Sequence, residues 1–306
     1  MQHLYIVGHP VGHSKSPVMY NKLFHDLGLT WSYDFKDIDT SAQADVFLQS
    51  KDYLAVNVTT PYKPNAYQCA QTRAASAKIA AGVNMLVNRS GVLVGFETDG
   101  TGCIRDLERI YGPVAGADIV ICGTGPTSRA IAYAAALAGA ERVSLIGRSV
   151  DRSRSILQQL ADTWRDLAYT SVDLPASSSG QLSFKEAYEA VTFRCGGYAT
   201  SAQALHNADI IIDATPLGMK ANDPAPFDTS VLRSDQLVYD VVYGHGETAL
   251  IAAAQACGCH AMTGQGMLVA QAVENATMLL NVEGVSNVPS WDEMFALMTD
   301  AAGFAC

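Results

Sequence analysis

The sequence has 306 residues, of which 49% are hydrophobic, and its formal net charge is −10 at pH 7. Because single domains cluster near ~100 to 150 residues, we expect two domains, and the hydrophobic content is ample for two cores. The excess of acidic residues disfavours a broad face for phosphate backbones, so we expect no nucleic acid partner.

Seven cysteines are scattered along the chain without a repeating framework, which indicates a reducing compartment. In the stretch Cys257-Gly258-Cys259-His260 only one residue separates the cysteines and no second pair follows, so we expect no metal site. The N-terminus lacks the features of a signal peptide, and no apolar run reaches the ~18 residues that a membrane helix needs. We therefore expect a cytoplasmic protein without a membrane partner.

The first hundred residues alternate short β-like runs with helical stretches, which is typical of an α/β domain. We expect the strands at 4–7, 32–38, 54–58, 84–87 and 92–95. We expect the helices near 17–28, 41–50 and 65–80. The segment Asn88-Arg89-Ser90-Gly91 separates two apolar runs and predicts a hairpin turn, and therefore an antiparallel strand pair near the sheet edge.

Two loops of this half carry polar side chains where strands end. The first, residues 8–17, holds Ser14 and Ser16, whose hydroxyls could bind a carboxylate, just before a proline suited to open a helix. The second begins at the polar end of the buried run 54–58, where Asn57, Thr59 and Lys63 are expected to enter the loop. Because α/β proteins build sites at strand ends, these loops predict a site for a small polar substrate.

The second half begins with a buried strand at 117–122, followed by the glycine loop Gly123-Thr124-Gly125-Pro126-Thr127-Ser128. An alanine-rich helix at 129–139 and a strand at 142–146 complete a βαβ unit. Small residues in such a loop let the backbone approach a pyrophosphate, while the helix N-terminus supplies N–H groups. The loop predicts a dinucleotide site, although a tight turn without a ligand remains the alternative.

The end of the strand at 142–146 distinguishes the two nicotinamide cofactors. An NAD site would have an acidic residue there for the ribose hydroxyl, whereas this chain has Gly147-Arg148-Ser149, with Arg152 one turn further on. Guanidinium groups suit a 2′-phosphate, so we predict NADP. Asp151 lies beyond the strand end and weakens this prediction only modestly. An exposed arginine without a cofactor role is the alternative.

Further strands are expected at 210–214 and 237–242, which would continue a doubly wound parallel sheet. The segment 174–181 has few large apolar residues and is expected to be a loop. After residue 246 the pattern is helical, at 247–257, 267–281 and 290–301, without partner strands of its own.

The two polar loops together resemble the shikimate dehydrogenase family. Residues 8–21 match its pattern GxPxxHSxSPxxxN, residues 57–63 match NVTxPxK, and the later motifs follow in the family's order. The resemblance implies an NADP-dependent enzyme that interconverts 3-dehydroshikimate and shikimate. It also implies an α/β fold of two domains, a substrate domain of residues 1–100 completed by the C-terminal helices of 244–306, and a Rossmann-like cofactor domain of residues 101–243.

The resemblance assigns the proton transfer to Lys63 and Asp99. Ketone reduction by a nicotinamide needs a proton as well as a hydride, and partial desolvation can tune a lysine toward neutral pH. A surface lysine and an aspartate that caps the next helix are the ordinary alternatives. The resemblance further implies that Ser14 and Ser16 bind the substrate carboxylate, and that its hydroxyls contact Thr59, Asn84 and Gln271.

Three residues near these positions depart from the family pattern. Glu97 replaces Asn in the GxNTD motif, Tyr20 stands where His is usual, and Met85 replaces Thr. The extra acid beside Asp99 either points outward without effect or alters substrate affinity and the pKa values of Lys63 and Asp99.

The remaining cofactor residues are also implied by the resemblance. Residues 213–219 resemble NATPxGM with Asp213 for Asn, 240–243 resemble DxxY, and 264–271 resemble GxxMLxxQ. Gly244-His245-Gly246 replaces the family's proline. The full set of predicted cofactor contacts is Gly123, Gly125, Pro126, Thr127, Ser128, Arg148, Ser149, Arg152, Thr215, Gly218, Met219, Val242, Tyr243, Gly264 and Met267.

Two alternatives stay open at this point. An NAD-linked quinate or quinate/shikimate dehydrogenase is disfavoured by Arg148 and Ser16. A sensor of the same fold that binds these ligands without turnover is disfavoured by Lys63 and Asp99. The sequence leaves open whether the chain is a monomer or a homodimer.

Overall fold

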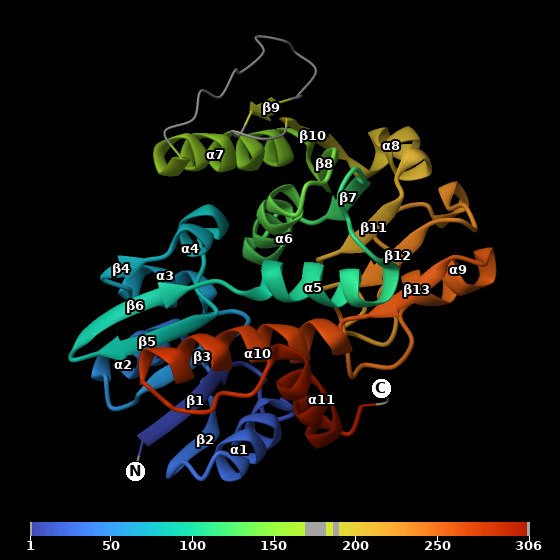
Figure 1. The fold of residues 1–306 in the computed structure, drawn as a ribbon. Helices are drawn as coiled ribbons and strands as arrows, with labels where there is room; N and C mark the ends of the chain where they lie inside the picture. The colour runs from blue at the N-terminus through green and yellow to red at the C-terminus, as the bar shows by residue number, and fades with distance from the viewer. Residues whose placement is uncertain (1, 169–181, 186–189, 305–306) are drawn as a thin grey trace. The chain divides into compact units, whose positions relative to one another are not determined.

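The computed structural model describes residues 2–168, 182–185 and 190–304 (Figure 1). The chain forms two compact units, of which the first contains Met1–Gly102 and Leu268–Cys306 and the second contains Cys103–Met267. The sequence placed the end of the second unit near residue 243, whereas in the structure this unit continues to Met267. The expected loop at 174–181 lies outside the described residues.

A six-stranded sheet with the order β2-β1-β3-β5-β6-β4 organises the first unit. Its strands are β1 (Gln2–Gly8), β2 (Trp31–Asp37), β3 (Ala55–Val58), β4 (Thr72–Arg73), β5 (Met85–Arg89) and β6 (Val92–Phe96). The β1 strand is parallel to both β2 and β3, whereas β5 and β6 pair antiparallel. The predicted hairpin is confirmed, and its turn has positive φ at Ser90 and Gly91.

The helices of the first unit cover both faces of this sheet. They are α1 (Ser16–Asp26), α2 (Ser41–Ser50), α3 (Lys63–Cys69), α4 (Ala75–Ala80), α10 (Gln265–Val282) and α11 (Trp291–Ala302). The α5 helix (Asp99–Tyr111) follows β6, and its residues from Cys103 onward belong to the second unit. The α2, α3 and α4 helices share one apolar core with β1, β3, β5 and β6. The α1 helix contacts α10 through the Tyr20 hydroxyl, which donates to the Ala272 carbonyl at 3.1 Å.

The prediction of one helix over 65–80 is wrong. The chain leaves α3 after Cys69, forms the two-residue strand β4, and starts α4 at Ala75. The β4 strand pairs with Val94 and Gly95 of β6 and so extends the sheet by one edge strand. A two-residue strand carries no periodic pattern, and its pairing depends on a partner about twenty residues away.

The second unit contains a seven-stranded sheet with the order β13-β12-β11-β7-β8-β10-β9. Its strands are β7 (Asp118–Cys122), β8 (Arg142–Gly147), β9 (Leu182–Lys185), β10 (Ala190–Gly197), β11 (Ile210–Asp213), β12 (Leu237–Asp240) and β13 (His260–Thr263). All pair in parallel except β9, which is antiparallel to β10. The predicted Rossmann-like doubly wound sheet is thus confirmed. Its helices are α6 (Pro126–Leu137), α7 (Val150–Ala168), α8 (Ala202–Asn207) and α9 (Ala249–Cys257).

The prediction that the chain after 246 lacks strands is also wrong. The β13 strand follows α9 and pairs in parallel with β12, from the Leu237–His260 pair to the Asp240–Thr263 pair. The α9 helix and β13 therefore belong to the second unit, and only α10 from Leu268 onward and α11 return to the first. Short edge strands such as β13 lack the long buried run that identifies central strands in a sequence.

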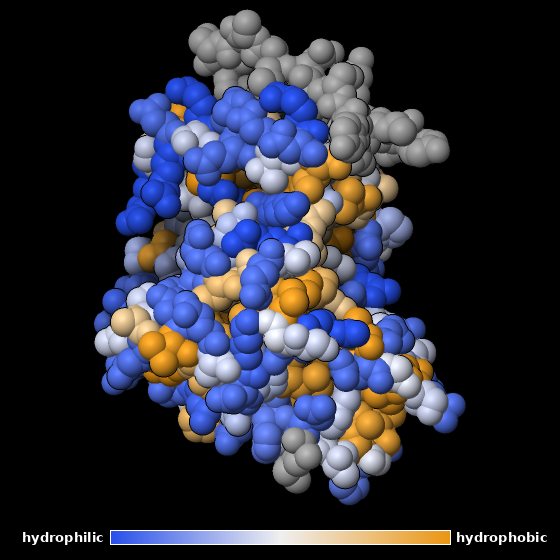
Figure 2. Space-filling view, turned by 90° about the vertical axis from the view of Figure 1, so that its left-hand side faces the viewer, coloured by the Kyte–Doolittle hydropathy of each residue, from blue (hydrophilic) through white to orange (hydrophobic). Residues whose placement is uncertain are grey.

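Much of the surface is hydrophilic, and hydrophobic side chains are interspersed on the face in Figure 2. Among the described residues, no helix combines the length and the apolar character that crossing a bilayer requires.

Candidate active site

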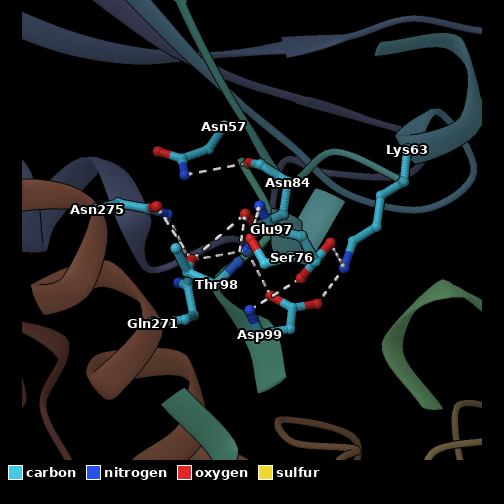
Figure 3. A network of polar contacts seen from close by, with 9 residues as sticks. All are labelled: Asn57, Lys63, Ser76, Asn84, Glu97, Thr98, Asp99, Gln271 and Asn275. Atoms are coloured by element: carbon cyan, nitrogen blue, oxygen red, sulfur yellow. Dashed lines mark hydrogen bonds and ion pairs between the residues drawn. The ribbon is translucent and has the colours of Figure 1, made fainter. Parts of the chain in front are cut away.

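Lys63 and Asp99 contact each other directly in the first unit. Lys63 is the first residue of α3, five residues after β3 ends, and its Nζ donates to Asp99 Oδ2 (Figure 3). The lysine is only 8% exposed, which excludes an ordinary solvated surface lysine. Asp99 opens α5, where a carboxylate also suits the positive end of the helix dipole.

Asn84 holds Asp99 from the other side. Its Nδ2 donates to Asp99 Oδ1 at 2.7 Å, while its Oδ1 accepts the Thr98 N–H at 3.0 Å. Asn84 is buried in the segment that precedes β5, and Figure 3 shows its amide directed toward the residues that open α5. Both oxygens of Asp99 thus have a partner, and the carboxylate is fixed in place.

Glu97, the residue that departs from the family pattern, points inward. Its side chain is fully buried, and its Oε2 lies 3.4 Å from Lys63 Nζ. Its Oε1 accepts the Asp99 N–H at 2.8 Å, and its own N–H donates to Ser76 Oγ of α4 at 3.3 Å. Of the two orientations left open by the sequence, the outward one is therefore excluded.

The charges of this cluster shift the pKa values of two of its members. Burial lowers the pKa of Lys63, but the Asp99 and Glu97 carboxylates outweigh it and raise that pKa above its ordinary 10.5. Desolvation therefore acts in the expected direction, but the two carboxylates make the net shift of the Lys63 pKa upward. Burial and the neighbouring Asp99 raise the pKa of Glu97 to about 8, even though Lys63 opposes this.

Gln271 is oriented by a residue that the sequence analysis missed. Asn275, one turn along α10 and fully buried, donates from Nδ2 to Gln271 Oε1 at 3.1 Å and accepts the Thr98 hydroxyl at 3.0 Å (Figure 3). A Cβ at Gly102 would lie 2.6 Å from the Gln271 backbone nitrogen, so only glycine permits this approach of α5 to α10. A buried asparagine four residues after a predicted contact was the available signal.

The predicted carboxylate-binding loop and the Thr59 loop leave the sheet at the same edge. Because β1 and β3 are parallel, with Val7 opposite Val58, the residues after both strands lie side by side. The Thr59 N–H donates to the Val7 carbonyl at 2.9 Å, and Thr59 is half-buried. Ser14 is half-buried and its Oγ accepts the Ser16 N–H at 3.2 Å, whereas Ser16 is buried as the first residue of α1.

The other two departures from the family pattern are buried in the hydrophobic core. Tyr20 is fully buried and stacks on Tyr33 with ring centroids 4.4 Å apart. Met85 is fully buried in β5. The Tyr20 hydroxyl donates to the Ala272 carbonyl and also hydrogen-bonds the side chains of Asn275 and Asn57, so this departure reaches the polar cluster. The departure at Met85 alters packing alone.

The glycine loop of the second unit leads from the end of β7 into α6, as the sequence predicted. Gly123 has φ of +117°, and a Cβ there would lie 2.6 Å from Ser128 Oγ and 3.0 Å from the Ala214 carbonyl oxygen. Gly125 precedes α6, which begins at Pro126, and a Cβ at Gly125 would meet nothing within 4 Å. Ser128 Oγ is buried and has no hydrogen-bond partner among the described residues.

Positive charge gathers at the end of β8. Arg148, Ser149 and Arg152 are exposed, and Arg152 Nε donates to Thr124 Oγ1 of the glycine loop at 3.3 Å. The Arg152 N–H donates to Ser149 Oγ at 3.3 Å. Asp151 forms an ion pair with Arg154 at 3.2 Å and is thus engaged away from the strand end. These residues fit a 2′-phosphate better than a free ribose hydroxyl.

The remaining predicted cofactor residues follow three neighbouring parallel strands. Asp213 at the end of β11 accepts the Thr215 N–H at 2.9 Å on Oδ1, while its Oδ2 is buried without a partner among the described residues. Burial and Asp240 raise the pKa of Asp213 to about 7. The others lie at the C-terminal edge of the same strands: Gly218, Met219, Val242, Tyr243, Gly264 and Met267. This edge is where open α/β sheets bind ligands.

Fold and site together define the class of protein. The first unit holds a buried lysine between two carboxyl groups, and the second is a Rossmann-like domain with a dinucleotide loop and cationic groups at the next strand end. This is the composition of a two-domain α/β protein of the nicotinamide-dependent dehydrogenase type.

Comparison with known proteins specifies the family. The family described as "Shikimate dehydrogenase substrate binding domain" matches residues 6–86. The shikimate dehydrogenase (NADP(+)) of Methanothermobacter thermautotrophicus is 32% identical over 273 residues, 88% of this chain and 87% of the relative. The one from Symbiobacterium thermophilum is 34% identical over 270 residues, 87% of this chain and 84% of the relative. The chain therefore belongs to the shikimate dehydrogenase family, as its sequence motifs predicted.

The fold agrees with solved structures of this family. Shikimate dehydrogenase from Aquifex aeolicus superposes with a TM-score of 0.77, covering 98% of this chain and 97% of that chain at 23% identity. The predicted two-domain α/β fold is thus confirmed, while the roles of the individual site residues stay predictions.

Proposed function

We propose that this protein catalyses the reversible NADP-dependent reduction of 3-dehydroshikimate to shikimate, a step of aromatic amino acid biosynthesis. The relatives that are 32% and 34% identical over most of the chain are named for this activity. The observation that carries the proposal is the buried Lys63, which is held by Asp99, while Asn84 fixes that carboxylate. An ammonium fixed in this way can deliver a proton to a carbonyl oxygen.

The proposed substrate contacts come from the first unit. Ser14 and Ser16 donate hydroxyl hydrogen bonds to the carboxylate. The ring hydroxyls contact Thr59, Asn84 and Gln271. Support comes from the parallel pairing of β1 and β3, which brings the Ser14 and Thr59 loops to one sheet edge, and from the bonds that orient Asn84 and Gln271. Orientation of this kind lowers the barrier by fixing the reacting groups before the reaction.

The proton transfer is the task of the chain's own residues. During reduction, Lys63 Nζ gives a proton to the carbonyl oxygen, and Asp99 Oδ2 orients the ammonium while it does so. During oxidation, the neutral amine accepts the proton of the substrate hydroxyl. NADP, when bound, supplies or accepts the hydride.

The proposed cofactor contacts come from the second unit. The backbone of Gly123 and Gly125 and the start of α6 suit the pyrophosphate, and so does the Ser128 hydroxyl, which has no partner among the described residues. Arg148 and Arg152 suit the 2′-phosphate. The loops after β11, β12 and β13 suit the nicotinamide, with Met219, which is 40% exposed, and Met267 among their residues.

The activity is tested by the initial rate of NADP reduction with shikimate, measured in parallel with quinate and with NAD. Rapid turnover selective for shikimate and NADP supports the proposal. Preference for quinate with NAD contradicts it and favours the quinate alternative. Binding of shikimate without turnover contradicts it and favours the sensor.

Two finer properties remain proposals. A cytoplasmic location is proposed from the odd number of scattered cysteines. We propose that the protein is either a monomer or a homodimer, and light scattering of the purified protein distinguishes the two.

A further inference from the structure

We propose that Glu97 is a positioning residue that controls the charge of Lys63, and thereby the pH range in which this lysine can donate a proton. The proposal rests on the proposed function of Lys63 as proton donor. It concerns a residue that replaces the family's asparagine in the GxNTD motif, so it sets this chain apart from that pattern.

The position of Glu97 is fixed from three elements. Its Oε1 accepts the N–H of Asp99 at the start of α5, its N–H donates to Ser76 of α4, and its Oε2 faces Lys63 of α3 at 3.4 Å. The side chain is fully buried, so water screens this contact poorly. Within the described part of the chain, the charged groups that face Glu97 are Lys63 and Asp99, and α4 presents the uncharged Ser76 hydroxyl.

If both carboxyl groups were ionised, Lys63, Asp99 and Glu97 together would carry a net charge of −1, which is unfavourable in a buried site. Burial and Asp99 raise the pKa of Glu97 to about 8, so below that pH the carboxyl is mostly neutral and Lys63 pairs with Asp99 alone. Above it, Glu97 is an anion that attracts the Lys63 ammonium. Deprotonation of Lys63 then requires a still higher pH, which agrees with the raised pKa of the lysine.

The consequence for reduction concerns its alkaline limit. Reduction adds a hydride from the reduced cofactor to the carbonyl carbon and a proton from Lys63 Nζ to the carbonyl oxygen, and the resulting amine regains a proton from water. The step needs the ammonium form of Lys63. An ionised Glu97 keeps that form at higher pH, whereas an amide at this position would not.

The test compares kcat of ketone reduction from pH 6 to pH 11 for the wild type, Glu97→Gln, Glu97→Asp and the exposed control Glu141→Gln. Glu97→Gln keeps the size of the side chain and an oxygen for the Asp99 N–H. We expect it to move the alkaline limb of kcat down by about one pH unit, the size of shift typical of losing a neighbouring charge. We expect Glu97→Asp to retain most of the wild-type limb, and Glu141→Gln to retain all of it.

The outcomes separate charge from structure. An alkaline limb that Glu97→Gln leaves unmoved overturns the proposal. So does a limb that Glu97→Gln and Glu97→Asp move equally, since loss of packing would then explain it. A change in KM for the cofactor without a moved limb likewise contradicts a role through Lys63.

A second measurement needs neither turnover nor a variant. The ¹³Cε chemical shift of Lys63 in the wild-type protein, followed by NMR from pH 6 to pH 11, should show a first step near pH 8 from Glu97 and a later one from the lysine itself. Absence of the first step overturns this inference even if the enzyme is active. Its presence in a protein that does not turn over shikimate supports the inference and contradicts only the proposed function.

Discussion

Glu97 in the first unit and Asp213 in the second are buried acids at positions where the family pattern has asparagine. Glu97 faces Lys63 at 3.4 Å and uses both oxygens. Asp213 uses one oxygen for the Thr215 N–H, leaves the other without a partner among the described residues, and its charged neighbour is the acid Asp240. The same replacement of an amide by an acid therefore provides a charge for Lys63 in one unit and only a desolvated carboxyl in the other.

This contrast matches the tasks of the two regions. Proton transfer requires an ammonium at a fixed place, and the first unit holds Lys63 between Asp99 of α5 and Glu97, the residue after β6. Anion binding requires donors that remain available, and the second unit exposes Arg148 and Arg152. Preorganised charges and dipoles are most effective where water is excluded. Lys63 is buried whereas Arg148 and Arg152 are exposed, so this condition is met better in the first unit than in the second.

The largest expected effect follows from removing the ammonium group of Lys63 in the first unit. Lys63→Ala should lower kcat by on the order of 10³-fold, because the proton donor is lost, with a much smaller change in KM. Steady-state kinetics with shikimate and NADP measure this, and Lys78→Ala, an exposed lysine of α4, is the matched control. An unchanged kcat would remove Lys63 from the mechanism.

The second prediction concerns the guanidinium groups of the second unit, and Arg148 in particular. Arg148→Ala should raise KM for NADP by about 10- to 100-fold and leave KM for NAD unchanged. This factor corresponds to the free energy of one charge-assisted hydrogen bond to the 2′-phosphate. Arg194→Ala, an exposed arginine of β10, is the control. An equal increase in KM for both cofactors would contradict the role in 2′-phosphate recognition.

The third prediction concerns Asp213, which should destabilise the protein at neutral pH. Its pKa is about 7 when folded and near 3.8 when unfolded, so the unfolded state binds fewer protons between these values and stability falls as pH rises through this window. Asp213→Asn should therefore raise the free energy of unfolding by up to about 4 kcal/mol at pH 8, since the pKa rises by about three units and each unit is worth about 1.4 kcal/mol.

Urea unfolding at pH 4, 6 and 8 measures this difference. The gain should be small at pH 4, where the wild-type carboxyl is protonated in the folded protein. The exposed Asp300→Asn variant is the control and should show no such growth with pH. A gain from Asp213→Asn that is the same at all three values would contradict the assigned cause.

The smallest expected effect tests the orientation of Gln271. Asn275→Ala removes its bonds to Gln271 and Thr98 and should raise KM for shikimate by about 5- to 10-fold, the value of roughly one neutral hydrogen bond, with little change in KM for NADP. Asn275→Asp keeps an acceptor for the Thr98 hydroxyl but places a second acceptor against Gln271 Oε1 in a fully buried site, so it should be affected at least as strongly. Equal effects on both Michaelis constants would instead indicate general unfolding near α10.

Local sequence patterns were sufficient for most of the central elements, although the interior strand β10 was not predicted. The buried runs of β1, β3, β7 and β11 and the glycine loop before α6 were predicted because their signals span neighbouring residues. The motifs around Ser14, Lys63 and Asp99 likewise predicted the family. The edge strands β4 and β13 were missed, because strands of two and four residues depend on a partner strand rather than on their own pattern.

The sequence by itself determined the fold class, the family and most of the candidate residues, because these depend on short motifs in a fixed order. Only the tertiary structure decided that Glu97 points inward, that Asn275 orients Gln271, and that the pKa of Lys63 is raised rather than lowered. Each of these depends on burial and charges contributed by several elements distant in the chain. No local sequence pattern contains these combined effects of burial and charge, because they arise only when the elements pack together.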